Sequence, residues 1–190
     1  MKNSILAGIM ISIGAALYLV IGGITGAILF SIGLLTILYF QFYLFTGKAG
    51  LFAEGKIRPG ELCKIWCGNL IGCAIGVIIL TLAGLGPAII PAATAILATR
   101  ISNIYFVNMF LGILCGILMY IAVNQYEKAP YVTIMCVAAF ILLSANHCIA
   151  DMVYILIAAT SETIGPGIAA LIWTTIGNMI GCNLIPSIKN

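Results

Sequence analysis

His147 is the only histidine in the sequence, and it lies within a long apolar stretch. Imidazole changes its charge near neutral pH, so this side chain can attract an anion or exchange a proton. An ionisable group inside a membrane segment is costly and usually marks a transport path. We therefore favour a transport role for His147 over a purely structural hydrogen bond.

Asp151 follows His147 by four residues, which places both side chains on one face if the segment is helical. The carboxylate could tune His147 or the exit of a path. It could also cap the free N–H groups at a helix start, and we favour this second interpretation.

Three further polar residues stand out. Asn69 and Asn178 lie inside apolar runs, where an amide needs a hydrogen-bonding partner. Bonds between helices and the lining of a path are equally good explanations for both. Arg100 lies at the end of another apolar segment, where it could draw anions to a pore mouth or anchor the chain at the membrane surface.

No enzyme chemistry and no cofactor is expected. The sequence contains neither a phosphate-binding loop nor a set of serine, histidine and carboxylate. Cys63 and Cys67 share a helical face, but no histidine or carboxylate completes a metal site with them. The remaining cysteines lie in apolar runs, where buried thiols behave as small hydrophobic groups.

The elements that position these residues must lie in a membrane. Of the 190 residues, 63% are hydrophobic and 7% are charged, against roughly 25% charged in a soluble domain. So few polar residues cannot cover a water-soluble globule. A cytosolic enzyme, a nucleic-acid-binding protein and a disordered protein are excluded, and we expect a single transmembrane domain over residues 1–190.

A membrane helix needs roughly 20 apolar residues, and the sequence offers six such stretches. They cover residues 4–21, 24–45, 65–85, 105–123, 131–159 and 168–185. We interpret the first as a retained helix, because the second begins almost at once. Between the third and fourth, Pro87 and Pro91 predict an apolar loop that ends at Arg100.

The positions of the basic residues support six spans. Lys and Arg concentrate in cytoplasmic loops, and an inside N-terminus leaves Arg100 alone outside. The predicted inside set is Lys2, Lys48, Lys56, Arg58, Lys64, Lys128 and Lys189. We therefore expect a multi-pass protein of the cytoplasmic membrane with both termini in the cytoplasm.

A short repeat relates the third span to the sixth. Gly-Asn-Leu-Ile-Gly-Cys at 68–73 recurs as Gly-Asn-Met-Ile-Gly-Cys at 177–182. Because the two spans are three crossings apart, the halves 4–85 and 101–185 should run in opposite directions. Such an inverted 3+3 repeat places a substrate path near the middle of the bilayer.

The repeat also predicts that the second and fifth spans correspond and that both are broken. We expect the breaks at 44–47 and 144–147, facing protein or a water-filled cavity. The free N–H groups of such helix starts would favour an anion. Glycines at four-residue spacing most simply predict close helix packing. They are Gly68, Gly72, Gly76, Gly112, Gly116, Gly177 and Gly181.

Four segments, in the same order, resemble motifs of the formate/nitrite transporter family. They are Leu-Phe-Thr-Gly at 44–47, Leu-Gly-Ile-Leu-Cys at 111–115, Ser-Ala-Asn-His-Cys-Ile-Ala-Asp-Met at 144–152 and Thr-Ile-Gly-Asn-Met-Ile-Gly at 175–181. The similarity runs from about residue 5 to residue 185, nearly the whole chain.

This resemblance implies a homopentamer of aquaporin-like protomers, each with its own pore for a small monovalent weak-acid anion. Formate is the first candidate, with nitrite and hydrosulfide next, and passage is passive or coupled to a proton. The implied path residues are His147, Thr46 opposite it, Asn178 and Arg100. The implied constrictions are Phe30 and Leu34 with Phe140 on one side, and Leu44 with Phe45 in the second-span loop.

Three residues depart from the family pattern and leave the substrate open. Asn146 stands where the family usually has an acidic residue, and Asp151 and Gly116 stand where it usually has asparagine. Gly116 could widen the path or remove a filter contact.

Two alternatives remain beside anion transport. A neutral-solute channel for water or ammonia fits the inverted plan, although neither Asn69 nor Asn178 is followed by the Pro-Ala of aquaporins. A membrane scaffold without transport activity is the other, and the central His147 argues against it.

Overall fold

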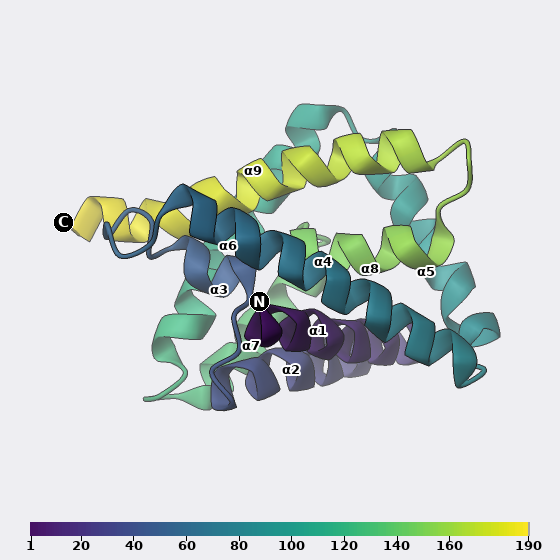
Figure 1. Ribbon diagram of the computed structural model, residues 1–190, viewed down its shortest axis with the longest axis horizontal. Coiled ribbons are helices and arrows are strands. Elements are labelled where there is room, and N and C mark those ends of the chain that lie inside the picture. Colours follow the sequence, from purple (N-terminus) through teal and green to yellow (C-terminus); the bar gives the residue numbers. More distant parts are fainter. Residues whose placement is uncertain (190) are drawn as a thin grey trace.

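The computed structural model describes residues 1–189, without the side chain of Lys189, and its elements in that range are all helices (Figure 1). The expected all-α fold agrees with these helical elements. Asn190 and the side chain of Lys189, one of the predicted cytoplasmic charges, lie outside the described residues.

Four helices are long and apolar enough to cross a bilayer, and they match four of the predicted spans. They are α1 (Lys2–Ile21), α4 (Pro59–Leu82), α6 (Tyr105–Gln125) and α9 (Ile164–Lys189). Along the view in Figure 1, α4 and α9 run in opposite directions.

The second and fifth predicted spans each consist of two shorter helices. The second is α2 (Gly23–Tyr39) followed by α3 (Phe45–Ala49), and the fifth is α7 (Pro130–Leu142) followed by α8 (Cys148–Ala158). In the second span the chain turns before the segment 44–47 that we expected to hold the break, and Gly47 lies inside α3.

The two interruptions are built in the same way. Gln41 and Ser144 both adopt a left-handed conformation, with φ of 56° and 54°. Beyond them, Phe42 N–H donates to the Ile37 carbonyl, and its counterpart Ala145 N–H donates to the carbonyl of Phe140, each over 2.9 Å. These are the bonds of a Schellman motif, which ends a helix and satisfies its last carbonyls.

The predicted loop with Pro87 and Pro91 is wrong, because this segment forms helix α5 (Gly86–Ser102). Pro87 occupies the first turn, where a missing N–H costs nothing. Pro91 removes only one internal hydrogen bond. The helix is held by one buried face that packs mainly on α8, and its buried residues are Ile89, Ala93, Leu97 and Arg100.

Matching glycine contacts hold the long helices together in pairs. Helix α1 packs on α4 as α6 packs on α9. A Cβ on Gly72 would collide with the Ile5 carbonyl, and one on Gly181 would collide with the Ile113 carbonyl. The expectation that the spaced glycines serve packing is confirmed at these positions.

Candidate permeation site

Two cavities in the described part of the chain are lined by several of the predicted path and constriction residues. The histidine cavity, of about 90 Å³, has room for a few water molecules or a small anion. It is lined by Tyr18, Ile96, Thr99, Arg100, Phe140, Ile141, Ser144, Ala145, His147, Ala150, Asp151 and Tyr154. The lysine cavity, of about 570 Å³, is lined by Leu34, Ile37, Leu38, Tyr39, Gln41, Phe42, Tyr43, Leu44, Gly47, Lys48, Val123, Asn124, Tyr126 and Glu127.

The connections between the helices place these cavities at opposite ends of the bundle. The histidine cavity lies at the ends of α1 and α7, and the lysine cavity lies at the ends of α2 and α6. Gly22 joins α1 to α2 in a hairpin, and a short turn joins α6 to α7 in another. Because each hairpin reverses the chain, its two helices end on opposite sides.

His147 lines the histidine cavity and is the residue that precedes α8. Its Nδ1 accepts a hydrogen bond from Ala150 N–H over 3.2 Å, so the ring caps the helix that it begins. Its Nε2 lies 2.9 Å from Thr46 Oγ1 on α3. Since Nδ1 is an acceptor, the hydrogen of the neutral ring lies on Nε2 and points to Thr46.

Apolar side chains surround this pair. The Phe140 ring stacks on His147 with centroids 5.7 Å apart, and Phe30 meets Phe140 edge-on at 6.1 Å. Leu34, one turn beyond Phe30 on α2, lines the lysine cavity together with Leu44. The side chains of these predicted constriction residues are buried, and most of them line one of the two cavities.

Phe45 lies apart from these side chains. It lines an apolar groove beside Trp66, although it directly follows Leu44. The structure therefore brings Phe30 and Phe140 together with His147 and Thr46. It places Leu34 and Leu44 together at the lysine cavity.

Asn69 and Asn178 hold the two interruptions in place. Asn69 Oδ1 accepts a 2.8 Å bond from Phe45 N–H, the first of α3, and Asn178 Oδ1 accepts one of the same length from Cys148 N–H, the first of α8. The Asn178 amide nitrogen donates to the carbonyls of Gly112 and Asn146. Hydrogen bonds to neighbouring segments thus explain both buried amides. Asn178 lines neither of the two cavities.

These bonds also occupy the helix starts. The N–H groups of Phe45, Cys148 and Ala150 already have partners within the chain. The expectation that free N–H groups at the broken helices collect an anion therefore finds no support from these three groups.

Arg100 and Asp151 form a buried ion pair, with Arg100 Nε 3.2 Å from Asp151 Oδ1. Both line the histidine cavity. Asp151 therefore pairs with α5, and the capping role that we favoured for it belongs to the His147 ring. Arg100 is only 8% exposed, so it is no surface anchor.

The comparison with known proteins decides the family. The model of the family described as "Formate/nitrite transporter" matches residues 1–188. The chain belongs to the formate/nitrite transporter family. None of the curated proteins matches the sequence.

Solved structures show that this transporter has the fold of that family. One, "Pentameric formate channel with formate bound", has a TM-score of 0.82 at 23% identity and covers 98% of this chain and 93% of the other. A second, "FNT family ion channel", has a TM-score of 0.81 at 21% identity and covers 99% and 87%.

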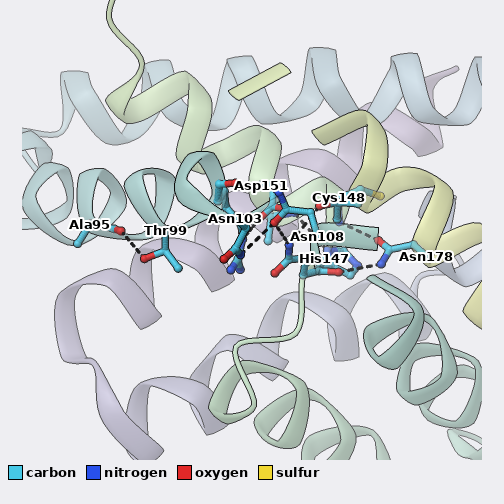
Figure 2. Close-up of polar contacts among 12 residues, drawn as sticks. Ala95, Thr99, Asn103, Asn108, His147, Cys148, Asp151 and Asn178 are labelled. Atoms are coloured by element: carbon cyan, nitrogen blue, oxygen red, sulfur yellow. Dashed lines mark hydrogen bonds and ion pairs between the residues drawn. The ribbon is translucent and has the colours of Figure 1, made fainter. Parts of the chain in front are cut away.

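The transporter contains a polar network that sequence reasoning missed (Figure 2). Asn146 Nδ2 donates to Asn108 Oδ1 over 2.9 Å and to Thr174 Oγ1 over 3.3 Å, and Asn108 donates in turn to the Arg100 carbonyl. Asn108 is a lone amide inside a predicted span, and this feature of the sequence could have indicated the network. Asn146 Oδ1 is buried without a partner among the described residues.

Gly116, one of the transporter's departures from the family pattern, lies at a helix contact. A Cβ there would lie 2.5 Å from the Asn178 carbonyl oxygen and 2.8 Å from Cys182 N. This glycine therefore allows α6 to approach α9, and it does not line either cavity.

Proposed function

We propose that this transporter passes a small monovalent weak-acid anion, formate foremost and nitrite or hydrosulfide as well, along a path that joins the two cavities at His147. One observation carries the proposal. The contact between His147 Nε2 and Thr46 Oγ1 supports it, because this polar pair lies among buried apolar side chains such as Phe140.

The electrostatics explain why this pair is needed. A bare anion loses several kcal/mol of hydration, or more, when it enters an apolar constriction. The Nε2–H of His147 and the hydroxyl of Thr46 can each donate a hydrogen bond to the anion at that point. The anion thereby shares a proton with the ring and is partly neutralised while it passes.

Complete proton transfer has a further requirement. A neutral imidazole that gives up its Nε2 proton must gain one on Nδ1, and Ala150 N–H occupies that position. We infer that the neutral ring supports anion passage, and that proton-coupled passage requires a second proton on His147 at lower pH.

We further propose six membrane crossings arranged as an inverted 3+3 repeat, with interrupted second and fifth crossings. The matching turns at Gln41 and Ser144 and the matching bonds of Asn69 and Asn178 support this plan. The basic residues favour cytoplasmic termini and the cytoplasmic membrane. We propose a homopentamer because the similar formate channel is described as pentameric.

A flux panel tests this function. Purified protein in liposomes should pass formate, nitrite and hydrosulfide at rates well above protein-free liposomes, with little change in osmotic water flux. Rapid osmotic swelling without anion flux would instead support a neutral-solute channel.

A further inference from the structure

Part of the Arg100 guanidinium remains free inside the histidine cavity. Its Nε is bound to Asp151, and no described residue accepts a hydrogen bond from its two terminal amino groups. Those nitrogens are also not among the fully enclosed, unpartnered atoms of the described residues. They therefore reach open space, although the side chain is about nine-tenths buried.

The open space that Arg100 lines is the histidine cavity. Arg100 also lines a narrow crevice with Leu97, but this crevice has no room for a water molecule. The free amino groups thus share a small cavity with His147, and the exposed side chains of Thr99 and Ser144 line its mouth.

The chemistry of this arrangement selects a shape of anion. The two terminal amino groups of a guanidinium form a planar fork that matches two oxygen atoms of one ligand. Asp151 occupies the Nε side and so leaves the fork to the cavity. The negative charge of Asp151 also offsets the positive charge of Arg100 and so weakens anion binding. Transport requires binding that is weak enough for the anion to leave.

We propose that Arg100 and Asp151 form a binding site for a planar two-oxygen anion, such as formate or nitrite, next to His147, in which Asp151 limits how tightly the anion is held. This inference rests on the proposed function and adds a residue-level basis for choosing between anions.

Arg100→Lys tests the fork, because lysine keeps the charge and the pairing with Asp151 but loses the planar donor pair. The half-saturation concentration for formate should rise about tenfold, and that for hydrosulfide, which has a single acceptor atom, should change much less. Arg58→Lys is the matched control at the only other arginine, which is exposed and outside both cavities.

Asp151→Asn tests the charge. The amide oxygen can still accept from Arg100 Nε, but the guanidinium charge is no longer offset. The half-saturation concentration for formate should fall about tenfold, and the maximal flux should fall with it because release slows. This variant also decides the matter if Arg100→Lys fails to fold in size-exclusion chromatography.

These measurements distinguish a failure of the Arg100–Asp151 site from a failure of the proposed anion transport. Equal shifts for formate and hydrosulfide in Arg100→Lys, or an unchanged formate affinity in Asp151→Asn, would overturn this site while leaving anion transport intact. Absence of any anion flux in the unaltered protein would overturn the proposed function and this site together.

Discussion

His147 uses its two ring nitrogens for different tasks. Nδ1 caps α8 through Ala150 N–H, and Nε2 faces Thr46. One side chain therefore fixes the start of a helix and presents a hydrogen-bond donor in the proposed path. Because the cap orients the ring, the direction of the Nε2–H bond is set before any anion arrives.

Thr46 should matter through its hydroxyl. Thr46→Val keeps the shape of the side chain but removes the partner of His147 Nε2, and we expect formate flux in liposomes to fall about tenfold. Thr46→Ser keeps a hydroxyl and should retain most of the flux. Equal losses of flux in both variants would mean that packing at this buried position, and not the hydroxyl, determines the formate flux.

Sequence reasoning identified several of these residues but not all of their partners. A lone histidine in an apolar stretch is a strong signal because an ionisable group there is costly. The pairing of Asp151 with Arg100 was missed because it depends on α5, which we expected to be a loop. The contacts of Asn146 likewise depend on which helices meet, and a single sequence does not show this.

At the scale of elements, the two interruptions combine the same frame with different chemistry. Each has a left-handed residue, a Schellman turn and an asparagine that binds the first N–H of the following helix. Within that frame Leu44 and His147 both occupy the position before the second helix. An imidazole therefore faces one cavity, and a leucine side chain lines the other.

The close contact of α6 with α9 should not tolerate a methyl group. A Cβ on Gly181 would meet the Ile113 carbonyl, so Gly181→Ala should lower the thermal unfolding temperature in detergent or prevent folding. Gly60→Ala, also in a helix but with open space around its Cβ, should be neutral or slightly stabilising. An unchanged unfolding temperature for Gly181→Ala would contradict this packing.

The elements themselves were partly predictable. Length and apolar composition identified the four long helices, and the repeat at 68–73 and 177–182 related α4 to α9. The error at α5 came from giving too much weight to Pro87 and Pro91. Its buried residues recur at helical spacing on one face, and this periodicity was present in the sequence.

At the scale of the whole molecule, the proposed path joins two cavities of unequal size. The larger contains Lys48 and Glu127, and the smaller contains the Arg100–Asp151 pair. The proposed orientation puts the larger cavity on the cytoplasmic side, because Lys48 belongs to the predicted inside set. The path would then narrow from the cytoplasm toward His147.

Cysteine labelling tests this orientation. In a background with Cys63 and Cys67 replaced by serine, Ser161→Cys should react with an impermeant thiol reagent added to intact cells. Glu127→Cys should react only after permeabilisation, and both positions are exposed, so access to the side chain does not limit either reaction. Labelling of Glu127→Cys in intact cells would reverse the assignment.

The central claim is that an anion passes His147 by sharing its Nε2 proton. The most direct test is formate flux into proteoliposomes through the unaltered protein and through His147→Asn, with flux through protein-free liposomes subtracted. His147→Asn keeps a good helix cap but removes the imidazole Nε2–H donor. We predict that its formate flux falls about tenfold or more. Equal flux through the two proteins would contradict the claim.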